Sequence, residues 1–119
     1  MSRKQSHRLV MIYDASHAWL RVRAWHLARL GIAQQISSYS YEDGQGYAYL
    51  EEDCDAPRFL AAAEAAGEPV TVTDRDDGGR SRVRDLDAYE PPSLEQRLAA
   101  ALEAQPLTRK IETQTAFSF

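Results

Sequence analysis

Residues 47–68 constrain the fold more than any other stretch, because a strand pattern there runs into an acidic turn and then into a helix pattern. Asp55 stands at the N-cap position of the helix, Pro57 falls in its first turn, and Gly67 follows its end. The apolar residues of the helix recur at helical spacing and form one face: Phe59, Leu60, Ala63 and Ala66. A strand followed directly by a helix with one apolar face predicts a helix that packs on a sheet.

The turn between this strand and helix, here called the acidic elbow, surrounds the chain's one cysteine, Cys54, with carboxylates: Glu51, Glu52, Asp53 and Asp55. Two interpretations fit this pattern. In the first, some carboxylates stabilise the helix N-terminus, each by roughly 0.3–1 kcal/mol, and the others are solvated. In the second, they form a binding surface for a basic partner, or a metal site.

Tyrosines alternate with small residues on both sides of a turn at residues 43–46, which reads Asp-Gly-Gln-Gly. This alternation predicts a β-hairpin. A three-residue loop of residues 44–46, with Gly46 in the left-handed region, sets Tyr41 opposite Tyr49. That register gathers four tyrosines on one face: Tyr39, Tyr41, Tyr47 and Tyr49. The face is either a patch that binds a partner or a half-buried sheet surface covered by a helix.

The remaining elements complete an α+β pattern. Periodicity and turn residues predict a buried strand at 8–13, a strand or helix approach at 19–22, a helix at 23–30 closed by Gly31, a hairpin joining 70–73 to 80–84, and a helix at 94–104. Ser93 and Gln96 form a capping box for the last helix. We therefore expect a mostly antiparallel sheet of four to six strands, with two or three helices packed on one face.

The C-terminal segment has a strand pattern as well. Its β-branched and apolar residues alternate on one side: Ile111, Thr113, Thr115, Phe117 and Phe119. We expect one domain over residues 1–119, with a core at about 8–90, a C-terminal helix at 93–105 and an ordered strand-like tail at 107–119. The tail either pairs with a sheet edge of its own chain or docks on another chain by strand addition. In the second alternative the helix and tail form a homodimer, with self-association through Ile111, Phe117 and Phe119.

Composition narrows the class of protein. A hydrophobic content of 44% and a charged content of 27% are those of a globular protein, which argues against wholesale disorder. No apolar run approaches 18 residues, and residues 1–7 lack the apolar core of a signal peptide. A single cysteine cannot form an internal disulfide. We therefore expect a protein of the cytoplasm of a bacterial host, with no membrane partner.

Charge is unevenly distributed along the chain, although the net charge is only −4. Residues 1–30 carry six Lys or Arg against one acid, whereas residues 31–70 carry one Arg against eight acids. A folded surface that keeps this separation has a basic face and an acidic face. Such a protein can orient itself against a charged partner or associate head to tail with another copy.

No stretch amounts to a catalytic signature. A cysteine enzyme would need Cys54 activated by His7, His17 or His26, but the surrounding carboxylates would raise the thiol pKa. A metal site would combine elbow carboxylates with His17 or His26, and no paired-histidine or CxxC spacing supports it. We predict no catalytic residue, no metal ligand and no cofactor.

Four segments together resemble a family of short uncharacterised proteins found on bacterial plasmids, integrative elements and phages. They are residues 16–22 (SHAWLRV), 30–33 (LGIA), 36–41 (ISSYSY) and 49–55 (YLEEDCD), within a resemblance that spans about residues 10–90. The family has no established activity, so the resemblance carries over no catalytic residue. It implies a context, since small accessory proteins of mobile elements often block host defences, and anti-CRISPR proteins are one such class.

We therefore expect a non-catalytic inhibitor that binds a host protein with a basic surface, in a nucleic-acid-targeting defence complex. Its acidic surface would combine Glu42 and Asp43 with the elbow carboxylates, beside the tyrosine face. Direct nucleic-acid binding is not expected in this interpretation.

Two alternatives stay open. The first is a small DNA-binding regulator of the mobile element, which requires the basic residues of 1–30, including Arg21, Arg23 and Arg29, to lie on one exposed face. The second is a small enzyme that uses Cys54 or the carboxylate cluster, which requires a histidine to approach the elbow.

Overall fold

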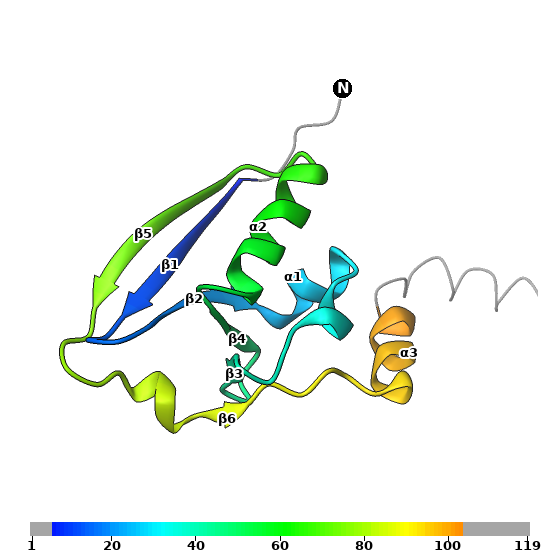
Figure 1. The fold of residues 1–119 in the computed structure, drawn as a ribbon. Helices are drawn as coiled ribbons and strands as arrows, with labels where there is room; N and C mark the ends of the chain where they lie inside the picture. Colours follow the sequence, from blue (N-terminus) through cyan, green and yellow to red (C-terminus); the bar gives the residue numbers. More distant parts are fainter. Residues whose placement is uncertain (1–5, 104–119) are drawn as a thin grey trace, which may run out of the picture.

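A six-stranded sheet forms the centre of the computed structural model, which describes residues 6–103 (Figure 1). The strands are β1 (His7–Tyr13), β2 (Ala18–Arg23), β3 (Tyr41–Glu42), β4 (Tyr47–Glu51), β5 (Val70–Asp76) and β6 (Asp87–Ala88). Their order is β5-β1-β2-β4-β3-β6, and every neighbouring pair is antiparallel except β1 and β5. The predicted α+β class is confirmed.

Three helices accompany the sheet: α1 (Ala24–Arg29), α2 (Asp55–Ala65) and α3 (Leu94–Glu103). Gly31 and Gly67 follow α1 and α2 with φ of 77° and 73°, so both predicted glycine stops are confirmed. Ser93 and Gln96 exchange the two hydrogen bonds of the predicted capping box at the start of α3. No helix in residues 6–103 is long and apolar enough to cross a membrane.

The main core lies between the sheet and the helices α1 and α2. Strand alternation turns Leu20 and Val22 of β2, with Ala48 and Leu50 of β4, toward this side, because successive side chains point to opposite faces. Phe59 of α2 is fully buried against them. The apolar helix face predicted from the sequence is thus the face that packs on the sheet.

The opposite face of the sheet is covered by the chain segment that follows β5. A 3₁₀ turn (Arg82–Asp85) brings Val83 against Ile12 and Trp19, which form a smaller buried cluster. Tyr41 and Tyr49 are half-buried at the edge of this cluster. The face that carries both tyrosines is therefore only partly covered.

Two predictions about the chain path are wrong. Residues 80–84 do not pair with 70–73, because α2 carries the chain across the sheet and β5 instead pairs in parallel with β1. Tyr39 was predicted to share a strand face with Tyr41, but β3 begins only at Tyr41 and Tyr39 lies in the preceding loop.

The prediction that Asp55 caps α2 is wrong. Cys54 occupies the N-cap position without a side-chain capping bond, and Asp55 is fully buried. Its carboxylate instead accepts hydrogen bonds from serines of the loop at residues 37–40. Pro57 lies in the first turn of α2 as predicted.

The third helix exposes an apolar stripe, as Leu94, Leu98 and Leu102 are 61%, 57% and 52% exposed. The predicted strand-like tail at 107–119, with Ile111, Phe117 and Phe119, lies outside the described residues. Self-association through this helix and tail therefore stays a prediction.

Candidate functional site

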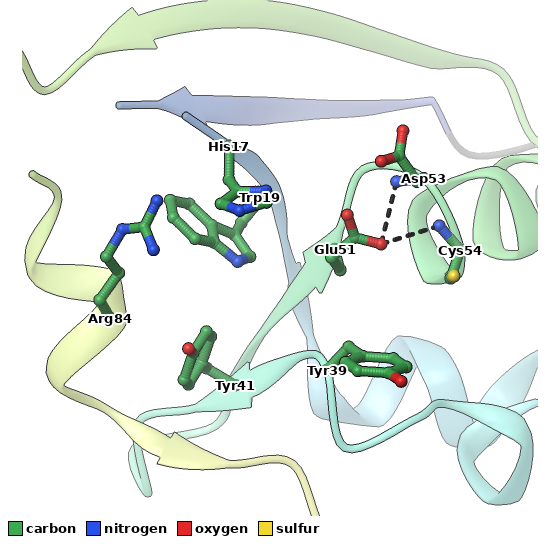
Figure 2. Close-up of a pocket in the computed structure, with 8 residues that line it drawn as sticks. All are labelled: His17, Trp19, Tyr39, Tyr41, Glu51, Asp53, Cys54 and Arg84. Carbon is green, nitrogen blue, oxygen red and sulfur yellow. Dashed lines mark hydrogen bonds between the residues drawn. The ribbon is translucent and has the colours of Figure 1, made fainter. Parts of the chain in front are cut away.

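A hollow of about 350 Å³ opens on the partly covered face of the sheet, near the start of β2 (Figure 2). We call it the acidic-aromatic hollow, and it is lined by His17, Trp19, Tyr39, Tyr41, Glu51, Asp53, Cys54 and Arg84. The elbow residues border one side and Arg84 borders the other, with the aromatic rings between them (Figure 2). The hollow thus brings together three residues of the acidic elbow, Glu51, Asp53 and Cys54. Two of the predicted tyrosines, Tyr39 and Tyr41, line it as well.

Glu51 closes the elbow from within. Its Oε1 accepts hydrogen bonds from the backbone N–H groups of Asp53 and Cys54, at 3.1 and 3.0 Å. These are backbone donors that would otherwise need water at the entry to α2. Asp53 is exposed beside this turn. Glu51 therefore shapes the elbow, and Asp53 is the carboxylate that it leaves free toward the hollow.

The buried carboxylate of Asp55 holds the loop that presents Tyr39. Its Oδ2 accepts hydrogen bonds from the hydroxyl groups of Ser37 and Ser40, at 2.7 and 2.6 Å, and from the backbone N–H of Ser37. The hydroxyl oxygen of Ser40 accepts from the backbone N–H of Glu51, which ties the loop to β4. Tyr39 projects from this anchored loop and is 71% exposed.

Arg84 is held in place by a second buried carboxylate, that of Asp14. The Nε of Arg84 donates to Oδ2 of Asp14, and Nη2 donates to Oδ1 at 3.1 Å. Backbone N–H groups of Ser16, His17 and Ser81 donate to the same carboxylate. The Arg84 guanidinium holds the pKa of Asp14 far below its usual range, despite burial. Arg84 thereby reaches the Trp19 ring, 5.3 Å from its centre, with its charge already paired.

Cys54 is poorly suited to nucleophilic attack. Partial desolvation raises the pKa of its thiol although the residue is exposed, and the neighbouring Glu51, Asp55 and Asp53 raise it further. His17 lines the same hollow, but no hydrogen bond joins it to Cys54 in the part of the chain that the structure describes. The arrangement therefore favours the uncharged thiol over the reactive thiolate.

The other predicted surface residues lie away from this hollow. Asp43 accepts from the backbone N–H groups of Gln45 and Tyr47 and from the hydroxyl of Tyr49, so it holds the hairpin turn together. Glu42 accepts from the backbone N–H of Glu90. Tyr49 pairs in the predicted register with Tyr41, which lines the hollow, but Tyr49 itself does not line it. Residue 52 is half-buried after β4 and does not line the hollow.

A second hollow, of about 310 Å³, lies at the other end of β2. We call it the basic-aromatic hollow, and it is lined by Ser6, His7, Arg8, Leu9, Val10, Arg21, Arg23, Trp25, His26 and Tyr47. The guanidinium groups of Arg21 and Arg23 lie 5.1 and 4.4 Å from the centre of the Tyr47 ring. Among residues 6–103, neither they nor Arg8 has a carboxylate within 4.0 Å.

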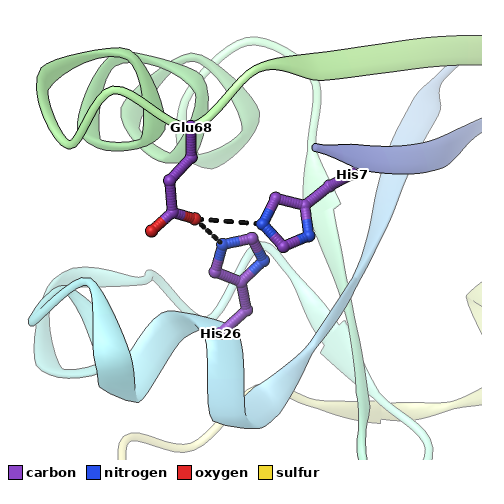
Figure 3. Close-up of side chains that lie close together, drawn as sticks. All are labelled: His7, His26 and Glu68. Carbon is purple, nitrogen blue, oxygen red and sulfur yellow. Dashed lines mark hydrogen bonds and ion pairs between the residues drawn. The ribbon is translucent and has the colours of Figure 1, made fainter. Parts of the chain in front are cut away.

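A cluster of two histidines and one glutamate, which the sequence reasoning missed, lies next to the basic-aromatic hollow (Figure 3). It joins His7, His26 and Glu68, which lie 19 and 42 positions apart in the chain. No local spacing could have revealed it, because each residue comes from a different element.

A scan against protein-family models finds no match to this chain, and searches of curated proteins and of solved structures find none.

Proposed function

We propose that this chain is a non-catalytic protein-binding inhibitor encoded by a mobile element or phage. In this proposal it binds a basic segment of a host nucleic-acid-targeting defence complex in the acidic-aromatic hollow. The observation that carries the proposal is the meeting of the acidic elbow with Tyr39 and Tyr41 in one hollow, where Tyr39 is 71% exposed.

The chemistry of the hollow suits a lysine or arginine side chain of a partner. An aromatic ring attracts a cation over its face, and a nearby carboxylate adds an ion pair. Asp53 and the rings of Tyr39 and Tyr41 offer both groups around one opening. Arg84 does not cancel this attraction, because its charge is paired with Asp14. The raised pKa of Cys54 further supports binding over catalysis.

The test is affinity capture from host lysate with and without nuclease, followed by mass spectrometry and by titration of the captured protein. The double substitution Tyr39→Ala and Asp53→Asn should weaken binding of that protein by about tenfold or more, as expected for an exposed aromatic anchor with a charged neighbour. Asp74→Asn is the matched control, because Asp74 is an exposed carboxylate of β5 outside the hollow.

Two outcomes would contradict the proposal. One is capture that persists unchanged in the double variant while the control behaves like the wild type. The other is capture of host protein that disappears with nuclease, which would mean that nucleic acid bridges the two.

A second candidate function, that of a small nucleic-acid-binding regulator, is favoured by a separate observation. Three arginines of the basic N-terminal segment line the basic-aromatic hollow without carboxylate partners among residues 6–103. Trp25 beside them stacks on the His26 ring but is still 53% exposed, and an exposed aromatic ring can stack on a base. Fluorescence anisotropy with single-stranded and duplex oligonucleotides separates this candidate from the inhibitor.

A further inference from the structure

We propose that His7, His26 and Glu68 form a binding site for one Zn²⁺ ion at the junction of β1, α1 and the turn between α2 and β5. The site is separate from the acidic-aromatic hollow, so it stands or falls independently of the proposed inhibitor function. It also lies outside the acidic elbow, the one place where a metal site was considered from the sequence.

The geometry of the three side chains carries the proposal. The Nε2 atoms of His7 and His26 lie 3.0 and 3.1 Å from the same oxygen, Oε1 of Glu68 (Figure 3). The three ligand atoms all lie within 4.8 Å of one another. Tetrahedral zinc with bonds of about 2.0–2.1 Å sets neighbouring ligand atoms roughly 3.3–3.4 Å apart. Small side-chain shifts therefore admit an ion among the three atoms.

Donor crowding around Glu68 also favours an ion. Its Oε1 faces both imidazole nitrogens and Nη2 of Arg29, which lies at 2.7 Å. A carboxylate oxygen has two lone pairs, so three donors exceed what it can accept well. A zinc ion bound by both Nε2 atoms and by Oε1 removes this conflict, because the nitrogens then bind the metal through their own lone pairs.

For two of the three ligands, His26 and Glu68, the surroundings favour the form that binds metal. His26 is almost fully buried, and burial lowers its pKa below the usual value, which favours the neutral imidazole. The pKa of Glu68 is also lowered, through hydrogen bonds from His26, Arg29 and His7 that outweigh its desolvation. Neutral histidine and ionised glutamate are the protonation states that zinc requires.

Arg29 has a positioning role in this site. Its Nη1 donates to Oε2 of Glu68 at 2.8 Å, on the side of the carboxylate away from the imidazole nitrogens. With an ion at Oε1, this bond can remain and orient the carboxylate, as outer partners of metal ligands commonly do. The side chain of Arg29 is 41% exposed, so water screens its repulsion of the ion.

The three ligands of the site come from distant parts of the chain. Among the described residues, this is the one group of three histidine, cysteine, aspartate or glutamate side chains whose ligand atoms converge. Three protein ligands leave a fourth tetrahedral position for water. His7 and His26 also line the basic-aromatic hollow, so that position is reached from its side.

The experiment is a titration of the untagged full-length protein with zinc chloride by calorimetry, with the metal content confirmed by mass spectrometry. We expect one ion per chain and a higher melting temperature with zinc, since a ligand of the folded state stabilises it. His7→Gln and Glu68→Gln should each weaken binding by at least about tenfold. His17→Gln is the matched control, because His17 is an exposed histidine outside the cluster.

A cobalt-substituted sample of the unaltered protein gives a readout that does not depend on whether a variant folds. Tetrahedral Co²⁺ with nitrogen and oxygen ligands should give visible absorption bands without a thiolate charge-transfer band. A thiolate band, which assigns the ion to Cys54, would overturn the proposal. So would an absence of zinc binding, or binding that His17→Gln abolishes and His7→Gln leaves intact.

Discussion

The two hollows at the ends of β2 use charge in opposite ways. In the acidic-aromatic hollow, Arg84 is paired with Asp14 and Glu51 closes the elbow, so most charged groups hold the structure together. In the basic-aromatic hollow, Arg21 and Arg23 contact the Tyr47 ring, and no carboxylate within 4.0 Å offsets them in residues 6–103.

The two hollows therefore differ in whether their charged groups mainly fix the shape of the opening or mainly attract a charged ligand. Groups that are already hydrogen-bonded define a rigid opening but contribute little long-range field, because their charges are neutralised nearby. Unpaired arginines attract anions over a distance and are screened by salt. The first hollow is therefore expected to select a partner mainly by fit, with Asp53 as its free carboxylate, and the second to bind mainly by charge.

Asp14→Asn should have the largest effect, because it breaks the support of the acidic-aromatic hollow. The asparagine amide lacks the negative charge that pairs with Arg84. Its NH₂ group also faces some of the N–H groups that now donate hydrogen bonds to the Asp14 carboxylate. Breaking a buried ion pair on one side is strongly destabilising, so the melting temperature should fall by roughly 10 °C. Thermal unfolding followed by circular dichroism measures this shift.

Asp74→Asn serves as the comparison for that measurement, since Asp74 is exposed on β5. Equal melting temperatures for Asp14→Asn and Asp74→Asn would show that the Asp14–Arg84 pair does not support the fold.

Arg21→Gln combined with Arg23→Gln should change binding without a comparable loss of stability. If an oligonucleotide binds the basic-aromatic hollow, each arginine that contacts phosphate contributes to the salt dependence of affinity. The slope of log affinity against log salt should fall by about one for each arginine removed. Anisotropy titrations over a range of salt concentrations measure this slope.

Arg97→Gln, an exposed change on α3, is the matched control and should leave the slope unchanged. An unaltered slope in the double variant would remove the basic-aromatic hollow from consideration as a phosphate-binding surface.

Structural features that depend only on neighbouring residues, such as the hairpin turn and the glycines that end two helices, were predicted correctly. The Asp-Gly-Gln-Gly turn and the alternation beside it led to the pairing of Tyr41 with Tyr49, because turn geometry sets hairpin register. The glycine stops at Gly31 and Gly67 were found in the same way. In these cases the physical cause lies within a few residues of its effect.

Features that depend on distant partners were missed or misassigned. Asp55 has the sequence position of a helix cap, but Ser37 and Ser40 approach it from another segment and offer better-placed donors. The parallel pairing of β1 with β5 depends on the path of α2, which no local pattern encodes.

The candidate sites divide along the same line. The elbow residues Glu51, Asp53 and Cys54 are close in sequence and could be grouped before the structure was known. Arg84 falls in the hairpin that was predicted for residues 70–73 and 80–84, but its partner, Asp14, lies 70 positions away. Sequence reasoning thus found one wall of the acidic-aromatic hollow and missed the other.

The smallest expected effect concerns Cys54 in the wall that sequence reasoning did find. Partial desolvation and the nearby carboxylates raise the pKa of the thiol, so at neutral pH less thiolate is present than for an ordinary cysteine. Iodoacetamide should therefore alkylate Cys54 more slowly than it alkylates glutathione at pH 7.5. The rate of Cys54 alkylation should reach half of its maximum above a pH of about 8.5. Glu51→Gln keeps an oxygen acceptor for the elbow but removes a negative charge, so it should speed alkylation by roughly two- to fivefold. A half-maximum below the ordinary thiol value would instead mean that the elbow stabilises the thiolate. The acidic-aromatic hollow would then resemble a nucleophilic site, and the small-enzyme alternative would outweigh the protein-binding one.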